Sequence, residues 1–192
     1  IYPNMRKSIF LSFILVFLSS SLYAAEYEMN PEQSSIQASI RYTVLGRYKA
    51  QFKEYDSAFY FDQEDIGNSF VEMVFHTALI DSGLARFDRI VRSERLLDAA
   101  QYPEITFRSH KIEKRDDDYW VRGELDLHGV KRELKFTFQL EEQNDGTIYA
   151  AGTWRINRKD FDIRWHPVFD VGGILVGNTI TIDWEILAEE AW

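Results

Sequence analysis

Residues 133–140 read Glu-Leu-Lys-Phe-Thr-Phe-Gln-Leu, so every second side chain is apolar and those between are polar or charged. The apolar set is Leu134, Phe136, Phe138 and Leu140. A period of two residues is typical of a β-strand with one buried face and one solvent face. We therefore expect a strand here, and we expect the same alternation to mark its neighbours.

Seven further stretches have this period or the composition of a strand. They are residues 36–44, 49–61, 71–79, 105–109, 119–127, 149–157 and 180–186. Turn-forming residues separate several of them, at 116–118, 128–129 and 144–146. Short turns between consecutive strands favour antiparallel pairing. The pattern predicts an all-β domain of eight antiparallel strands.

Residues 84–100 interrupt the alternation. Their apolar positions at Phe87, Ile90, Val91 and Leu97 fit one or two short helices, which we expect to cover one end of the sheet. Eight alternating strands form either a sandwich or a closed barrel. The interior of such a barrel is filled with side chains or holds one small ligand, and alternation alone does not choose between these outcomes.

The first 25 residues have the pattern of a cleaved signal peptide. Met5-Arg6-Lys7, the expected start, is basic, residues 8–22 are uncharged and apolar, and Ala24-Ala25 offers small residues before the mature chain. An uncleaved anchor is the alternative, but a run of about 15 residues is shorter than the roughly 20 that span a membrane. We expect an exported domain over residues 26–192.

Charge and composition exclude several classes of function. The chain has 22 Lys and Arg against 31 Asp and Glu, a net charge of -9, which argues against a nucleic-acid partner. It has no cysteine, so disulfides, thiolate metal sites and a cysteine nucleophile are excluded. The four histidines are far apart, and we expect no metal site and no catalytic residue. Asp160 and Asp162 could form an acid–base pair, but solvated turn residues are the favoured interpretation.

Several motifs, in order along the chain, resemble the YceI-like family of lipocalin-like proteins. Three of them are 102–107 (Tyr-Pro-Glu-Ile-Thr-Phe), 123–130 (Gly-Glu-Leu-Asp-Leu-His-Gly-Val) and 156–162 (Ile-Asn-Arg-Lys-Asp-Phe-Asp). The others lie at 34–36, 46–52, 80–83, 88–98 and 172–177. Together they extend over essentially the whole mature chain, which makes the resemblance specific.

The resemblance implies an eight-stranded antiparallel lipocalin-like barrel in the periplasm. Its apolar interior would hold a polyisoprenoid or quinone-like lipid, without a cofactor and without catalysis, and the protein would make at most transient contact with membranes. With strand alternation, the resemblance predicts a barrel lining of Phe75, Phe107, Leu125, Phe136, Phe138, Trp154, Trp165, Ile182 and Trp184. Phe87, Ile90 and Val91 are the candidate entrance. The resemblance fixes no oligomeric state.

Two alternatives stay open from the residues alone. The protein could be an enzyme that acts on a barrel-bound lipid through polar groups of residues 158–162, or a filled barrel that binds a protein partner. The chain also departs from the family, whose members often have histidine at Gln33, Tyr42 and Ile90 and arginine at Phe87. These positions are expected near the barrel mouth and the head group of a ligand.

Overall fold

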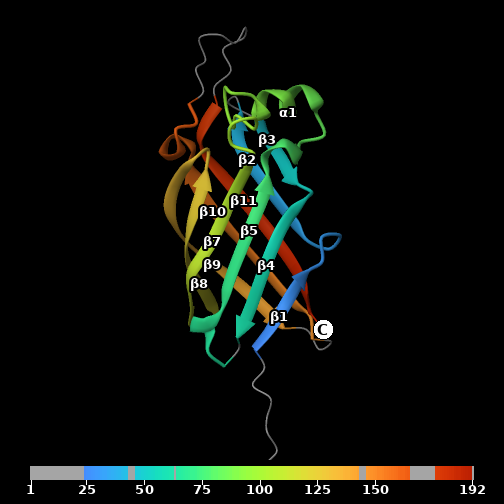
Figure 1. Ribbon diagram of the computed structural model, residues 1–192, viewed down its shortest axis with the longest axis vertical. Helices are drawn as coiled ribbons and strands as arrows, with labels where there is room; N and C mark the ends of the chain where they lie inside the picture. Colours follow the sequence, from blue (N-terminus) through green and yellow to red (C-terminus); the bar gives the residue numbers. More distant parts are fainter. Residues whose placement is uncertain (1–23, 43–45, 63, 143–145, 165–175, 192) are drawn as a thin grey trace, which may run out of the picture.

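The computed structural model describes residues 24–42, 46–62, 64–142, 146–164 and 176–191. The described part is almost entirely β-structure, with one α-helix and three short 3-10 helices (Figure 1). The elements are β1 (Ala24–Met29), β2 (Ser35–Tyr42), β3 (Gly46–Phe52), β4 (Tyr55–Asp62), η1 (Ile66–Asn68), β5 (Phe70–His76), η2 (Thr77–Leu79), β6 (Ile80–Asp81), α1 (Ala85–Arg92), β7 (Glu104–Arg115), β8 (Asp118–Leu127), β9 (Val130–Glu142), β10 (Ile148–Asn157), η3 (Arg158–Phe161) and β11 (Val176–Glu190).

Eight of these strands form a closed antiparallel ring in the order β1-β4-β5-β7-β8-β9-β10-β11. The ring closes because β11 pairs with β1, with Tyr27 opposite Glu190 and Met29 opposite Ala188. Closure leaves no free edge along this ring. The predicted eight-stranded barrel is confirmed.

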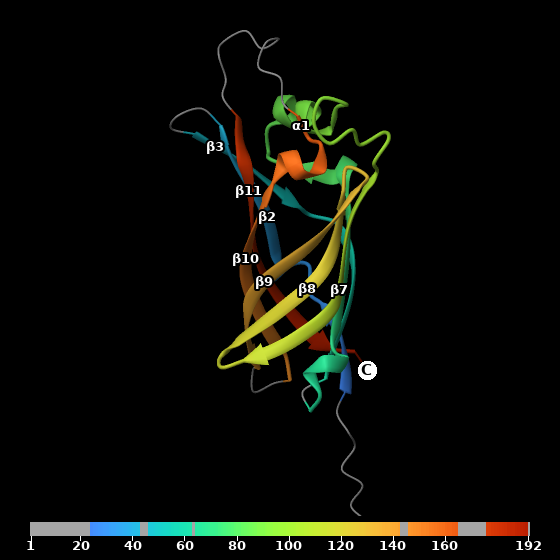
Figure 2. The ribbon, with the colours of Figure 1, turned by 90° about the vertical axis from the view of Figure 1, so that its left-hand side faces the viewer.

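The long strand β11 changes partner along its length. Its last residues pair with β1, and residues 180–185 pair with β2, which in turn pairs with β3. Strands β2 and β3 therefore extend the wall beyond the ring, toward the end of the barrel where α1 lies (Figures 1 and 2). We call this the helix end. Strand β1 lies at the opposite end.

The strands differ from the sequence prediction in several places, and β7 and β11 are longer than the predicted stretches 105–109 and 180–186. Strand β1 is not predicted, since Tyr27 and Met29 are its only large apolar residues. The predicted strand 49–61 is broken at 53–54, where the chain passes from pairing with β2 and β6 to pairing with β1 and β5. The predicted strand 71–79 ends at His76, and η2 follows. The predicted covering segment contains the single helix α1.

Two inward-facing glycines allow aromatic rings to lie against the barrel wall. A Cβ atom on Gly123 would lie 2.6 Å from Phe107 Cζ and 2.6 Å from the carbonyl oxygen of Arg108. A Cβ atom on Gly152 would lie 2.7 Å from Trp184 Cζ2. The two rings therefore pack close to the backbone, in space that a side chain at either glycine would occupy.

Changing Gly123 to Ala tests this packing. The new methyl group meets backbone as well as the Phe107 ring, so we expect the free energy of unfolding to fall by about 1–3 kcal/mol. Urea denaturation followed by circular dichroism measures the change. The control is Gly67→Ala, where the added atom meets only the Asp65 carboxylate oxygen, at 3.1 Å. Equal stability of the two variants would contradict the close packing.

Candidate binding site in the barrel interior

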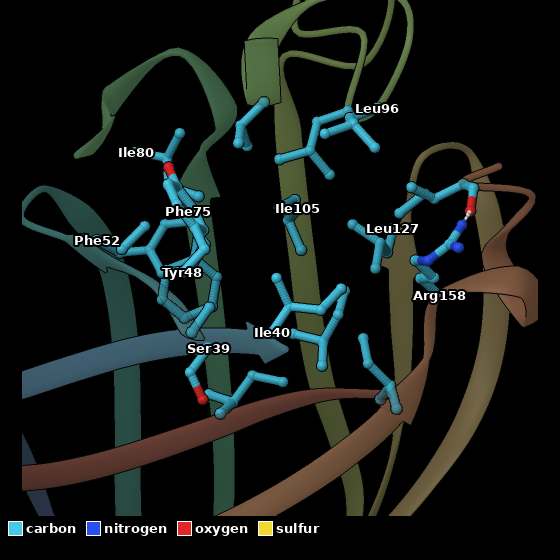
Figure 3. A pocket seen from close by; sticks show the side chains of 18 of the residues that line it. Ser39, Ile40, Tyr48, Phe52, Phe75, Ile80, Leu96, Ile105, Leu127 and Arg158 are labelled. Carbon is cyan, nitrogen blue, oxygen red and sulfur yellow. Dashed lines mark hydrogen bonds between the residues drawn. The ribbon is translucent and has the colours of Figure 1, made fainter. Parts of the chain in front are cut away.

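The interior of the barrel contains two apolar cavities. One, of about 140 Å³, lies at the helix end and is shown in Figure 3. The other, of about 70 Å³, lies deeper, toward β1. We call them the helix-end cavity and the inner cavity. Both are lined by Ile36, Phe75, Trp154 and Ile182, and we call these four residues the shared ring.

The helix-end cavity is lined by residues from most of the elements at that end of the barrel. Val91, Leu96 and Leu97 cover it from α1 and the segment that follows. Beyond the shared ring and these three, its lining residues are Ala38, Ser39, Ile40, Tyr48, Ala50, Phe52, Ile80, Ile105, Leu125, Leu127, Ile156, Arg158, Ile163, Val176 and Ile180.

The inner cavity is lined by apolar side chains alone. Its floor includes Met29 from β1 and Phe59 from β4. Beyond these and the shared ring, the lining residues are Val71, Met73, Phe107, Val121, Phe136, Phe138, Ala150, Trp184 and Ile186. Neighbouring rings in this cluster make edge contacts, such as Phe136 with Trp154 at 4.9 Å between centroids. The Nε1 of Trp154 is buried and has no hydrogen-bond partner among the described residues.

Strand alternation places these side chains inside. In β8, Leu125 and Leu127 are 3% and 4% exposed, whereas Glu124 between Gly123 and Leu125 faces outward. Glu124 accepts a hydrogen bond from Lys131 across the β8–β9 hairpin, at 2.8 Å. A period of two therefore gives the interior its apolar surface and the exterior its charge.

The structure brings the predicted lining residues together at the two cavities. Phe75, Trp154 and Ile182 belong to the shared ring, Leu125 lines the helix-end cavity, and the inner cavity has the rest, namely Phe107, Phe136, Phe138 and Trp184. Trp165 lies outside the described residues.

The predicted entrance residues are only partly at the cavity. Val91 lines the helix-end cavity, whereas Phe87 and Ile90 line neither cavity. Phe87 instead packs on Tyr48, with 5.9 Å between ring centroids. Among the family departures, Gln33 is exposed in the turn after β1, and the side chain of Tyr42 lies outside the described part of the chain.

A buried carboxylate fixes α1 over the end of the barrel. Asp88, 5% exposed, accepts hydrogen bonds from the backbone N–H of Ser82 at 3.0 Å, from the Ser82 hydroxyl at 2.5 Å and from the Tyr48 hydroxyl at 3.0 Å. Burial raises the pKa of Tyr48 to about 12, so this hydroxyl remains a donor at neutral pH. Arg92 of the same helix donates to the carbonyl oxygen of Ile80.

Arg158 was expected only as one of the polar groups of residues 158–162, and not as a lining residue of the barrel. It is 5% exposed and lines the helix-end cavity beside Leu127 (Figure 3). Asn157 caps η3 by accepting a hydrogen bond from the backbone N–H of Lys159, which fixes the turn that directs Arg158 inward. Arginine is rarely buried, and no sequence pattern distinguishes Arg158 from the exposed arginines.

The candidate acid–base residues lie outside the cavities. Asp160 and Asp162 are both exposed, and Asp162 pairs with Arg164 at 3.2 Å. His76 and His110 pair with carboxylates on the outer surface, at 3.3 Å and 3.8 Å. Within the described ranges, no three His, Asp or Glu side chains form a group that could hold a metal ion. None of the helices in that part has the length and apolar character needed to cross a membrane.

Comparisons with known proteins agree with this architecture. The protein is similar to BcnA of Burkholderia cenocepacia, with a TM-score of 0.75 and 20% identity over 83% of this chain and 99% of that one. It is also similar to a polyisoprenoid-binding domain from Saccharophagus degradans, with a TM-score of 0.69 and 13% identity over 88% of this chain and all of that one. At these identities the likeness shows a shared fold.

Other known proteins are more similar to this chain in sequence than these two solved structures are. The chain is 31% identical to protein YceI of an Escherichia coli strain, over 83% of this chain and 88% of that protein. It is 30% identical to a UPF0312 protein of Vibrio parahaemolyticus, over 96% and 98% of the two chains. The model of the YceI-like domain matches residues 27–188. The chain therefore belongs to the YceI-like family.

Proposed function

We propose that this protein binds a polyisoprenoid, or a similarly long apolar lipid, inside the barrel and acts as its carrier. The observation that supports this most is the pair of adjacent apolar cavities that share four lining residues. A filled barrel would have no such space. A structural neighbour described as a polyisoprenoid-binding domain supports the same ligand class.

The size of the cavities limits the length of chain that enters without movement. A cavity of about 150 Å³ with apolar walls holds a benzene molecule. The helix-end cavity, at about 140 Å³, therefore suits one five-carbon isoprene unit, and the inner cavity is half as large. A tail longer than about two units must displace side chains, and the rings of Phe75 and Trp154 are the ones it would meet between the cavities.

The energy of burial is consistent with reversible binding. Each methylene-sized group transferred from water contributes roughly 0.8 kcal/mol, so two isoprene units contribute about 8 kcal/mol before the cost of ordering the tail. A dissociation constant of 1 μM corresponds to about 8.2 kcal/mol. A tail of two units is therefore held weakly enough to be released, as a carrier requires.

Filling the shared ring tests the hollow interior. In Ile182→Trp the larger side chain enters the cavities, so we expect at least tenfold weaker binding of a C15 prenyl alcohol, measured by native mass spectrometry, with thermal stability kept. The control is Glu185→Trp on the same strand, where the side chain is exposed.

The stability of Ile182→Trp distinguishes a hollow barrel from a filled one. In a filled barrel the added volume would overpack the core and lower the free energy of unfolding by about 1–3 kcal/mol. Such a loss of stability, with prenyl alcohol binding the same in both tryptophan variants, would count against a lipid site in the interior.

We infer that the mature protein is exported. The support is the pattern of residues 1–25, of which 1–23 lie outside the described part of the chain. Cleavage after Ala25 would remove the first two residues of β1, which pair with Asp62 and Phe61.

Intact-mass measurement of the protein recovered from a periplasmic extract tests the export proposal. The expected mass is that of a chain beginning near Glu26. Recovery in the cytosol, with the mass of a chain that still begins at Met5, would overturn it.

A further inference from the structure

Four arginines occur in α1 and directly after it, at the helix end of the barrel (Figure 1). They lie within residues 84–95, whose only carboxylates are Asp88 and Glu94. Asp88 is buried, so Glu94 is the only exposed carboxylate of this segment. The segment is therefore basic at its surface, in a chain that has 31 acidic residues against 22 basic ones.

Three of these arginines are exposed and have no carboxylate partner. Arg86, Arg89 and Arg95 are absent from the ion pairs of the described ranges. On the barrel wall, by contrast, basic side chains such as Arg108 and Lys131 pair with a neighbouring carboxylate. We call the three arginines the arginine patch. Their charge is available to an anionic surface outside the protein.

The neighbouring strand β3 adds to this positive charge. Arg47 and Lys49 are exposed on its outer face, and neither forms an ion pair in the part of the chain that the structure describes. Tyr48 between them lines the helix-end cavity and packs on Phe87 of α1, with 5.9 Å between ring centroids. The basic surface therefore continues from α1 to β3.

Two exposed leucines accompany the arginine patch. Leu84 directly precedes α1 and is 56% exposed, and Leu79 in η2 is 38% exposed. Proteins that bind at the surface of a bilayer combine basic and apolar side chains in this way. The cations meet the lipid phosphates, and the apolar side chains enter the boundary between head groups and acyl chains.

The opposite end of the barrel has the opposite charge. Its exposed carboxylates lie in β1, before η1, in the turn between β7 and β8, and at the ends of β9 and β11. They are Glu26, Glu28, Glu64, Asp65, Asp116, Asp117, Glu141, Glu142 and Glu189.

The two ends are far enough apart to act independently. Strand β10 has 10 residues, which span about 33 Å, or about 25 Å along the axis at a barrel tilt near 40°. The Debye length at physiological ionic strength is only about 8 Å. An anionic surface therefore attracts the helix end and repels the opposite end, and this asymmetry orients the protein.

We propose that the helix end docks on a bilayer surface rich in anionic phospholipid, with the arginine patch against the lipid phosphates and Leu84 in the interface. Val91, Leu96 and Leu97, which cover the helix-end cavity, belong to the same segment of the chain. Docking therefore brings the cover of the cavity to the membrane. The inference rests on the proposed function and adds the partner that supplies or accepts the lipid.

Flotation of the protein with vesicles tests the docking. One set of vesicles contains equal parts of phosphatidylglycerol and phosphatidylcholine, and the other contains phosphatidylcholine alone. Each basic residue near an anionic surface raises the affinity about fivefold, so we expect at least about tenfold tighter binding to the anionic vesicles at low salt. At about 0.5 M salt, where the charges are screened, this preference should disappear.

Paired variants assign the binding to the arginine patch. In the double variant Arg86→Gln/Arg89→Gln the affinity for anionic vesicles should fall at least about tenfold. The control is Lys114→Gln/Arg122→Gln, two exposed residues of β7 and β8 away from the helix end. It removes the same charge, and its affinity should stay within about threefold of the wild type. An equal loss in the two double variants would assign the effect to net charge and overturn the patch.

A dye at one position tests the orientation. The chain has no cysteine, so a single introduced cysteine can be labelled with an environment-sensitive dye. On Leu84→Cys the emission should shift to shorter wavelength when anionic vesicles are added. On Glu64→Cys, at the opposite end, it should not. A shift at Glu64→Cys as large as that at Leu84→Cys overturns the orientation.

The outcomes separate this inference from the proposed function, which binding of the C15 prenyl alcohol tests by itself. If the wild-type protein binds both kinds of vesicle equally, or neither, docking on an anionic bilayer is overturned, and an acidic protein becomes the partner that the patch fits. Binding of the prenyl alcohol in the same protein then leaves the proposed function in place. Vesicle binding without prenyl alcohol binding overturns the proposed function and keeps the docking surface.

Discussion

Pairing of the C-terminal end of β11 with β1 turns the sheet into a closed cylinder, and everything that the interior does depends on this closure. Without it, two strands would have free edges and the apolar faces of all the strands would meet water. The earlier residues of β11 pair with β2, and this pairing extends the wall toward α1. The same strand thus closes the barrel and lengthens it.

The inner cavity lies among closely packed aromatic side chains, such as Phe107 of β7 and Trp154 of β10, whose ring centroids are 5.3 Å apart. The rings of Phe107 and Trp184 pack against Gly123 and Gly152, in space that a side chain at either glycine would occupy. The apolar surface that remains can bind many tails of similar length, since burial of hydrocarbon is not directional.

Much of this arrangement follows from the sequence. A period of two residues fixes which face of a strand is buried, so the positions of Leu125, Phe136 and Ile182 inside the barrel could be predicted. Whether the interior is hollow could not be predicted from the sequence. It depends on how far the inward-facing side chains reach across the barrel. A hollow barrel and a filled barrel have the same alternation of apolar and polar residues along their strands.

The parts that sequence reasoning missed depend on tertiary contacts. The strand β1 is short and half polar, and it is stabilised by its two neighbours, β4 and β11. Arg158 is held by the carbonyl oxygen of Ile163, five residues further on, and by Gly177 and Asn178, which are 19 and 20 residues further on. Both features, the strand β1 and the burial of Arg158, depend on contacts that exist only in the folded barrel.

A crystal structure of the protein grown with a C15 prenyl ligand tests the central claim most directly. The account predicts continuous ligand density inside the barrel, from beneath Leu96, past displaced side chains of Phe75 and Trp154, to the neighbourhood of Phe59. Ligand density on the outer surface alone, with the interior side chains in contact across the barrel axis, would contradict it.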